Sequence, residues 1–523
     1  MSRILPVCLL SLLLGSMSAV QAADFTVTRL DDPSSALCLP GNCSLRGAVL
    51  AAASPGAHRI LLPPGIVNLQ LGALELSSQV QFVGNASNTS SISATGSQPI
   101  LRVLAGGQVE VRSVILDSTH GTIIELGGTS SLRLERVSQI ENQRVLMVDP
   151  AAQADLTIVD SFLRALVICG QLGGHCRVEG STIGSLIVGG PESRAEAQLR
   201  RCTIQGTPGV HPLLSGLIVN GLAALSMEDC EVRNSLRPLA LYQNGAVGQA
   251  PPVSVRRSRF VGNQGPLRGS RRGLVQLEEV WIHNHAVDPN SGFSTDYTQA
   301  PSVLLAEEGP DWQILRSAIR TNFGVASDGR TVLLNPGGRV LLDNVYFEHN
   351  TRVDGLGTGI SDGIGVYAGP GQAPRLRILH STILRSNLIQ VGGVGPVFGL
   401  RGALADVRFD NTAINGVCNF PSPNVEVAGQ GNVVAMTSCG LDAAHNFTQV
   451  TPALIELEPF GFWGGPTPSR PPTAVSALVG RASPVHCSPR DQRGALRPAN
   501  GVGCDVGSVQ HNVAMPMFAD GFE

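Results

Sequence analysis

A short pattern that returns twelve times between residues 109 and 414 constrains the fold of this chain more than any other feature. Each copy reads apolar, any, apolar, two mostly polar residues, a small or β-branched residue, any, apolar. Leu156, Ile158, Ser161 and Leu163 form one copy, and successive copies lie 20 to 37 residues apart. A period of this length predicts a solenoid. The alternation of apolar residues predicts short strands with one buried side.

The two polar residues inside each copy are expected at a bend between two strands. Two short strands joined by a bend in every turn predict a right-handed parallel β-helix, because loops of variable length can leave its coils without disturbing the stack. A leucine-rich repeat is the main alternative, but it requires a stricter length and an Asn or Cys within a Leu framework. The sixth positions of the copies are Val114, Val137, Ser161, Ser181, Cys202, Cys230, Ser258, Val280, Ser317, Val345, Ser381 and Thr412.

Composition and charge exclude several classes of function. The 523 residues include only 15 Phe, 4 Tyr and 3 Trp, which favours a core of stacked aliphatic side chains. All 37 basic residues are arginine, so neither lysine Schiff-base chemistry nor a P-loop lysine can occur. The net charge of −3 is spread evenly along the chain, which argues against a nucleic-acid partner.

The N-terminus predicts a secretory signal peptide over residues 1–22. Arg3 supplies the positive charge, Ile4 to Leu14 form the apolar run, and Val20-Gln21-Ala22 fits the small-residue cleavage rule. No later stretch is long and apolar enough to span a membrane. We therefore expect a secreted or cell-surface protein, and a monomer.

Ten cysteines follow the signal segment, an even number that fits an oxidising compartment. Cys202 and Cys230 hold the same position in consecutive copies, so they would stack about 4.8 Å apart, within the range that a disulfide accepts. Two buried free thiols are the alternative. The expected pairs are Cys38–Cys43, Cys169–Cys176, Cys202–Cys230, Cys418–Cys439 and Cys487–Cys504.

The two ends of the chain are expected to differ from the repeats. Residues 23–58 would form an N-terminal cap, in which a helix follows a capping Asn42 or Ser44 and plugs the open end of the β-helix over residues 59–440. Residues 441–511 would form a C-terminal segment, and residues 512–523 a tail. Within the C-terminal segment, the stretch Pro459–Pro472 is interpreted as an irregular linker, with an aromatic loop packed over the last coil as the alternative. The expected apolar face of the helix comprises Leu45, Ala48, Val49 and Ala52.

Both ends resemble known motifs. Cys38 followed by Cys43-Ser44-Leu45-Arg46-Gly47-Ala48 resembles the signature of the CSLREA-domain family of exported bacterial β-helix proteins, with Gly47 in place of the family's Glu. Asp491-Gln492-Arg493-Gly494, Arg497-Pro498 and Cys504-Asp505-Val506-Gly507 resemble the closing motif of the choice-of-anchor β-helix proteins. Gly507-Ser508-Val509-Gln510 departs from that motif and lacks its Glu. The resemblance implies a secreted or cell-surface β-helix, but no reaction.

Candidate catalytic residues lie in the long loop after the tenth copy. They are His349, Arg352, Asp354 and Asp362. Hydrolysis of a glycoside needs two carboxylates facing each other across a groove, and a lyase needs a cation or Arg together with a base. The glycines of this loop equally favour a flexible loop without activity.

A second long loop, from His283 to Asp311, could hold Ca²⁺ through its acidic residues, although solvated loop charges are the simpler interpretation. We interpret the asparagines that end several copies as corner residues in the left-handed backbone conformation. The loop contains His283, His285, Asp288, Asp296, Tyr297, Glu307 and Glu308, and the asparagines are Asn263, Asn284, Asn322, Asn350 and Asn387.

Three hypotheses of function follow. The first is a non-enzymatic extracellular or surface protein whose extended face binds a polysaccharide or a surface protein, since stacked coils give a long regular surface. The second is a polysaccharide lyase or glycoside hydrolase that acts on an extended glycan. The third is a structural spacer without a partner. No cofactor is expected apart from the Ca²⁺ just considered.

Overall fold

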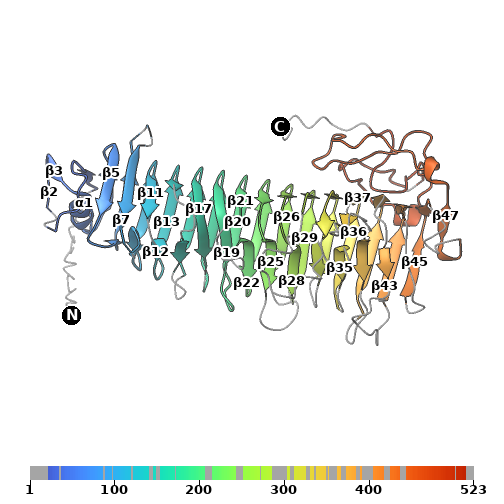
Figure 1. Cartoon of the computed structure of the whole chain (residues 1–523), viewed down its shortest axis with the longest axis horizontal. Helices are drawn as coiled ribbons and strands as arrows, with labels where there is room; N and C mark the ends of the chain where they lie inside the picture. Colours follow the sequence, from blue (N-terminus) through green and yellow to red (C-terminus); the bar gives the residue numbers. More distant parts are fainter. Residues whose placement is uncertain are drawn as a thin grey trace, which may run out of the picture.

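The chain folds into an elongated parallel β-helix with a helical cap at its N-terminal end (Figure 1), as seen in a computed structural model. The structure describes residues 22–513, with gaps of which the longest are 207–214, 243–250, 286–302, 353–361, 392–404, 417–424 and 436–442. The prediction of a parallel β-helix is confirmed. The predicted signal peptide and most of the tail lie outside the described residues.

Each coil of the β-helix contributes strands to three faces. The first face is a 16-stranded parallel sheet. Its strands are, in order, β1 (Asp24–Thr26), β4 (Ala57–Leu61), β7 (Gln79–Val83), β10 (Gln108–Arg112), β13 (Ser131–Glu135), β16 (Asp155–Val159), β18 (His175–Glu179), β20 (Glu196–Arg200), β23 (Ala224–Glu228), β26 (Val253–Arg256), β29 (Leu274–Glu278), β32 (Asp311–Leu315), β36 (Arg339–Asp343), β40 (Arg375–Leu379), β43 (Ala405–Asp410) and β45 (Val425–Gln430).

The second face follows the first around each coil. Its strands are β5 (Gly65–Leu69), β8 (Ser90–Ala94), β11 (Ile115–Ser118), β14 (Ser138–Gln139), β17 (Phe162–Cys169), β19 (Thr182–Val188), β21 (Thr203–Gln205), β24 (Glu231–Arg233), β27 (Arg259–Val261), β30 (Trp281–His283), β33 (Ala318–Arg320), β37 (Tyr346–Glu348), β41 (Thr382–Leu384), β44 (Ala413–Asn415), β46 (Asn432–Val434) and β47 (Phe447–Gln449).

The third face completes the coil, and β17 and β19 run on into it. Its other strands are β6 (Leu74–Leu76), β9 (Leu101–Val103), β12 (Thr122–Leu126), β15 (Val145–Val148), β22 (Gly216–Asn220), β25 (Arg237–Tyr242), β28 (Leu267–Ser270), β31 (Leu304–Ala306), β35 (Arg330–Leu334), β39 (Asp362–Val366) and β42 (Ile389–Val391). Two short pairs lie outside these faces: β2 (Cys38–Leu39) with β3 (Asn42–Cys43), and β34 (Phe323–Gly324) with β38 (Thr351–Arg352).

The apolar residues of the repeat stack in register inside the β-helix. Val109 of β10 pairs with Leu132 of β13, which pairs with Leu156 of β16. All three side chains are buried, and they belong to one core that runs from the cap to Phe447. The period-two alternation of the sequence therefore corresponds to one inward row after another.

The second residue of the polar pair turns the chain from the first face to the second. In all twelve copies this residue has a positive φ, between 40° and 60°. This left-handed conformation makes the sharp bend that the polar pairs predict. It is unfavourable for most residues that carry a side chain. The twelve residues are Ser113, Arg136, Asp160, Gly180, Arg201, Asp229, Arg257, Glu279, Arg316, Asn344, His380 and Asn411.

The small residue at the sixth position joins neighbouring coils by hydrogen bonds. The Ser161 hydroxyl accepts a hydrogen bond from the N–H of Val137 on the preceding coil at 3.0 Å and donates to the carbonyl of Val159 at 2.7 Å. Ser181 repeats both contacts one coil later. The N–H that follows a left-handed corner points away from the strand ladder, so the hydroxyl of the next coil satisfies it.

The asparagines at the next corner play two different roles. Asn284 has the left-handed conformation that we predicted, with a φ of 56°. Asn263 and Asn322 do not, so the prediction is wrong for them. Both are fully buried and accept hydrogen bonds from the N–H groups of Ser235 and His285, respectively. Asn350 and Asn387 lie outside the described residues.

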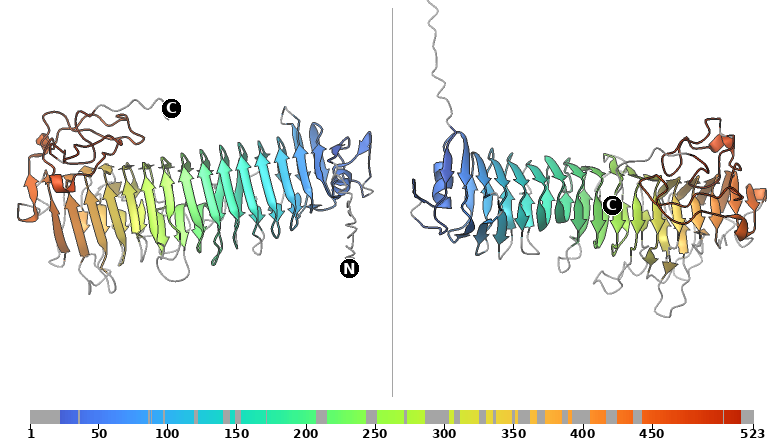
Figure 2. Two further views of the ribbon diagram at one scale, coloured as in Figure 1. Left: turned by 180° about the vertical axis from the view of Figure 1, so that it is seen from behind. Right: turned by 90° about the horizontal axis from the view of Figure 1, so that it is seen from above.

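Helix α1 (Leu45–Ala51) closes the N-terminal end as predicted (Figure 2). Ser44 is the N-cap, and its hydroxyl accepts a hydrogen bond from the Gly47 N–H at 3.1 Å. Arg46 binds both carboxylate oxygens of the buried Asp32, at 2.7 and 2.8 Å, and donates to the Gly72 carbonyl at 2.8 Å. The cap is thereby fixed to the first coil. The predicted apolar face, Leu45, Ala48, Val49 and Ala52, is buried.

The C-terminal segment folds back along the side of the β-helix (Figures 1 and 2). We call residues 450–513 the clamp. They contain the short 3-10 helices η5 (Pro452–Leu454) and η6 (Pro484–His486), after η4 (Ala443–His445). Stretch Pro459–Pro472, which we predicted to be a linker, instead forms an irregular hairpin, with bridges Leu457–Pro472 and Gly461–Ser469. It packs against the side of the β-helix rather than over its last coil.

The clamp is hydrogen bonded to the corner residues of four successive coils. Atoms of the clamp thereby satisfy backbone and side-chain polar groups of the corner residues, which a sharp corner would otherwise leave without hydrogen-bond partners. The contacts are Thr467 Oγ1 to the Arg316 carbonyl (3.1 Å), Arg497 Nη2 to Asn344 Oδ1 (2.9 Å), His380 Nε2 to the His486 carbonyl (3.0 Å) and the Ser483 N–H to Asn411 Oδ1 (2.6 Å).

The cysteine predictions have mixed outcomes. Disulfides Cys38–Cys43 and Cys487–Cys504 are present as predicted. The two pairs expected inside the β-helix, Cys169–Cys176 and Cys202–Cys230, are wrong, because all four residues are buried free thiols. Cys418–Cys439 lies outside the described residues.

Candidate binding face

From β10 to β43, the outward side of the first face carries three parallel rows of mostly polar residues, interrupted by apolar ones such as Ala224 and Leu274. Two rows flank a central one, because every second residue of a strand points outward. In the middle of the β-helix the central row consists of hydroxyl and amide side chains that are exposed or half-buried. Its members, each in register with the next, are Gln198, Ser226, Ser254, Gln276 and Gln313.

The flanking rows and the adjoining corners are rich in arginine and carboxylate residues that pair with one another across coils. Arg257, at a corner, binds Asp229 at 2.8 Å and Glu228 at 2.6 Å, both from the preceding coil. Arg316 binds Glu278 and Glu279 in the same manner. Further pairs across coils are Arg112–Glu135, Arg133–Glu110, Arg201–Glu179, Arg200–Glu228, Arg256–Glu278, Arg339–Asp311 and Arg377–Asp406, whereas Arg177 and Glu179 pair within β18. Glu110, Arg133, Arg177 and Arg377 belong to the central row, outside its hydroxyl and amide stretch.

Ion pairing lowers the pKa of two carboxylates on this face, Glu179 and Glu135. Hydrogen bonding from Arg177, aided by the charges of Arg201 and Arg200, lowers the pKa of Glu179. Burial opposes ionisation of Glu135, but the neighbouring arginines outweigh it and lower that pKa as well. A general acid needs a raised pKa. Glu179 and Glu135 are therefore suited to structure and recognition rather than to proton transfer.

Two described carboxyl groups have a raised pKa: Asp343 lies on the β-helix beneath the clamp, and Asp505 lies within the clamp. Burial raises the pKa of Asp343, whose carboxylate accepts a hydrogen bond from Ser488 at 3.0 Å. Burial also raises the pKa of Asp505, which binds the Gly480 N–H at 2.7 Å. These groups support the packing of the clamp and are not placed to meet a substrate.

The predicted catalytic residues are only partly described. Arg352 lies in β38, in register with Gly324, and Asp362 lies in β39, in register with Arg330. Their side chains, together with His349 and Asp354, lie outside the described residues. The catalytic assignment stays a prediction.

The residues of the predicted Ca²⁺ loop that are described have other partners. His285 is buried, and its ring lies 3.1 Å from the Asn263 amide. His283 stacks on Trp281, and burial, with the charge of Arg259, lowers its pKa to about 4. Asp311 pairs with Arg339. The acidic residues Asp288, Asp296, Glu307 and Glu308, and Tyr297, lie outside the described residues.

One group among the described residues has the spacing of a metal site. His380, Cys487 and Cys504 bring potential ligand atoms within 4.8 Å of one another. The two sulfur atoms, however, are joined in a disulfide, so they are not thiolate ligands. Within the part of the chain that the structure describes, no helix is long and apolar enough to cross a membrane.

Sequence reasoning missed the polar rows although the pattern contained them. The residues between the apolar positions of each copy are those that face outward, and Gln276 and Glu278 of one copy already show the central and flanking rows. The pattern does not predict which arginine pairs with which carboxylate, because these ion pairs depend on which coils become neighbours.

Comparison with known proteins gives weak matches in structure alone. No family model matches the chain, and neither does any curated protein. Tailspike protein 3 of bacteriophage CBA120 is 11% identical over 78% of this chain and 56% of its own, with a TM-score of 0.38; the chain thus spans little more than half of that protein. A PL6 polysaccharide lyase from Pseudopedobacter saltans is 11% identical over 78% and 96%, with a TM-score of 0.31. A PL6 alginate lyase bound to a trisaccharide is 10% identical over 94% and 96%, with a TM-score of 0.33. We transfer no activity or residue role from them.

Proposed function

We propose that the protein is a non-enzymatic recognition protein that binds an extended polysaccharide along the outward side of the first face. The observation that carries this proposal is the central row of Gln198, Ser226, Ser254, Gln276 and Gln313, which lies beside the paired charges at the corner end of the same strands. One hydroxyl or amide group per coil recurs about every 4.8 Å, a spacing comparable to the length of one sugar unit in a chain.

The chemistry of the row supports a glycan as partner. Amide and hydroxyl groups donate and accept hydrogen bonds, as sugar hydroxyls do. Arginines beside the row are paired with carboxylates, so binding here would rest on hydrogen bonds rather than on a strong positive field, which argues against a nucleic acid as the partner. A regular track with many modest contacts suits recognition of a long repeating chain.

We also propose that the protein is exported and related to the CSLREA-domain β-helix proteins. The predicted signal segment and disulfides Cys38–Cys43 and Cys487–Cys504 support export, since disulfides persist in oxidising compartments. Each motif also contains an arginine with a structural role. Arg46, in the N-terminal motif, fixes the cap through Asp32, and Arg497, in the closing motif, fixes the clamp through Asn344. N-terminal sequencing of the exported chain tests the cleavage after Ala22.

The binding proposal is tested with a triple variant of the central row, Gln198→Ala, Gln276→Ala and Gln313→Ala. At roughly 1 kcal/mol for each lost hydrogen bond, we expect about a hundredfold weaker binding. Binding is measured by affinity electrophoresis in gels that contain alginate, polygalacturonate or a neutral β-glucan. Gln153→Ala, at an exposed position just before β16, is the matched control.

Release of oligosaccharides is measured in the same experiment, with and without Ca²⁺. Binding without release, lost in the triple variant and kept in the control, is the expected result. Release of products would instead favour a lyase or hydrolase and direct attention to Asp354 and Asp362. Equal binding by the triple variant and the natural chain would show that the first face is not the binding surface.

A further inference from the structure

Several aromatic residues gather where the clamp meets the second face. Of the three tryptophans, Trp312 is buried in the core, with 1% of its surface exposed. Trp281 and Trp463 lie on the second face and the clamp hairpin, respectively. Phe462 and Trp463 remain 57% and 37% exposed. Two large exposed rings at consecutive positions mark an interaction surface more often than a single one does.

Ring contacts fix the clamp hairpin on the second face. Trp281 of β30 stacks on His283, with ring centroids 3.9 Å apart, and Phe462 meets Trp281 edge-on at 5.8 Å. Phe460, two residues earlier, lies over the guanidinium group of Arg320 at 3.9 Å. The hairpin that presents Phe462 and Trp463 is therefore anchored at two places.

The exposed indole of Trp463 is itself held in place. Its Nε1–H donates to the Pro459 carbonyl at 2.9 Å, and its own carbonyl accepts from Arg493 Nη1 at 3.5 Å. Arg493 is in turn bound to the buried Asp491 at 2.8 Å. A ring that is fixed yet exposed loses little entropy when a ligand covers it.

We propose that Phe462 and Trp463 form an aromatic ledge that stacks against the apolar face of a pyranose ring. This inference rests on the proposed glycan-binding function and adds a site for a single sugar ring, next to a polar strip of the second face. Arg259 is in register with Trp281, and Glu231, in register with Arg259, binds it at 3.2 Å. These groups supply donors and acceptors for the hydroxyls at the edge of the stacked sugar.

The test compares Trp463→Ala and Phe462→Ala with Val475→Ala in the full mature chain. Val475 is 74% exposed on the same clamp but offers no ring, so it is the matched control. Binding to alginate, polygalacturonate and a neutral β-glucan is followed by affinity electrophoresis, and indole fluorescence is followed during titration with the corresponding oligosaccharides. Thermal unfolding confirms that the variants fold.

We expect each ledge variant to bind about tenfold more weakly, which corresponds to the loss of one aromatic stacking contact, and Val475→Ala to bind as the natural chain does. The fluorescence change on ligand addition should disappear in Trp463→Ala. Natural affinity in both ledge variants would overturn the ledge, while the central-row variant still decides the proposed function. If the natural chain binds none of the three polysaccharides, the ledge and the proposed function fail together.

Discussion

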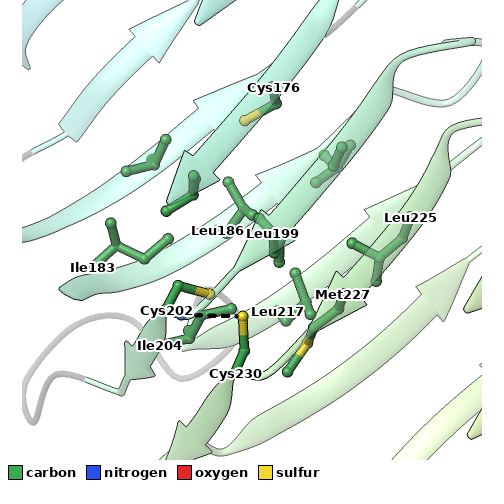
Figure 3. Close-up of a cluster of buried hydrophobic side chains, with 14 of the residues drawn as sticks. Cys176, Ile183, Leu186, Leu199, Cys202, Ile204, Leu217, Leu225, Met227 and Cys230 are labelled. Carbon is green, nitrogen blue, oxygen red and sulfur yellow. Dashed lines mark hydrogen bonds between the residues drawn. The ribbon is translucent and has the colours of Figure 1, made fainter. Parts of the chain in front are cut away.

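The thiol of Cys230 accepts a hydrogen bond from the backbone N–H of Cys202 at 3.2 Å (Figure 3) and donates to the carbonyl of Glu228, also at 3.2 Å. These are the same two contacts that Ser161 and Ser258 make at the equivalent position of their coils. Residues in register on parallel coils project their side chains in the same direction. The Cys230 thiol therefore hydrogen bonds to the backbone of the preceding coil instead of bonding to the sulfur of Cys202. Stacking thus explains both why a disulfide looked feasible and why the thiols are free.

Two replacements of Cys230 distinguish the contribution of its hydrogen bonds to stability from that of its packing. Cys230→Ala leaves the buried N–H of Cys202 without an acceptor, so we expect the free energy of unfolding to fall by about 1–3 kcal/mol. Cys230→Ser keeps the acceptor and should remain within about 1 kcal/mol of the natural chain. Urea unfolding of the two variants measures the difference, and equal stabilities would contradict the role of the hydrogen bond between Cys230 and Cys202.

The state of the cysteines can be read directly by mass spectrometry. After unfolding without reductant, iodoacetamide should label Cys169, Cys176, Cys202 and Cys230, and should leave Cys38–Cys43 and Cys487–Cys504 linked. In the folded chain the four thiols should resist labelling, because they are buried. Burial raises the pKa of Cys169, and the hydrogen bond with Cys230 raises that of Cys202. A linked Cys202–Cys230 peptide would refute the hydrogen bonding of the free Cys230 thiol.

Local sequence patterns predicted those parts of the fold that depend on periodicity. The alternation around Leu156 and Ile158 gave the strands, and the apolar spacing of Leu45, Ala48 and Val49 gave the capping helix. Each of these signals arises within a few residues, and the stacking of identical units extends it over the whole solenoid.

The clamp and the binding surfaces could not be predicted in the same way. Pro459–Pro472 has no periodicity, and its position is set by contacts with residues more than a hundred positions away, such as Thr467 with Arg316. The pairing of Arg257 with Asp229 likewise depends on which coils become neighbours. Composition alone indicates a loop or an outward charge, but it contains no information on such partners.

Gly47 is predicted to be required in the capping helix. In a helix interior Gly→Ala ordinarily stabilises by about 1 kcal/mol. Here a Cβ atom would lie 2.9 Å from the Leu37 carbonyl oxygen and 3.2 Å from the Ser44 hydroxyl. We therefore expect Gly47→Ala to lower the free energy of unfolding by about 1 kcal/mol, whereas Leu50→Ala, on the exposed side of α1, should have little effect. A more stable Gly47→Ala variant would show that the β2–β3 hairpin yields easily.

Arg497 is expected to hold the clamp on the β-helix. Its buried guanidinium donates to Asn344 at 2.9 Å, to the Gly507 carbonyl at 2.7 Å and to the Asp505 carbonyl at 3.1 Å. Arg497→Met leaves these acceptors buried without donors, so the clamp should lose about 3 kcal/mol of stability. Hydrogen exchange should then increase across residues 450–513 and not in the N-terminal coils. The exposed Arg481→Met serves as control, and unchanged exchange in Arg497→Met would contradict the role.

His283 should make the stability of the junction between clamp and second face depend on pH. Burial, with a smaller contribution from Arg259, lowers the pKa of folded His283 to about 4 from 6.5. Between these values the unfolded chain binds more protons than the folded one, so the free energy of unfolding should fall as the pH decreases from 6.5 towards 4. His283→Phe keeps a ring against Trp281 but cannot titrate, and it should show a shallower decrease. Melting temperatures at pH 7.5 and 4.5 measure this, with the exposed His175→Phe as control. If the His283→Phe and natural chains lose the same stability, the pH dependence arises elsewhere.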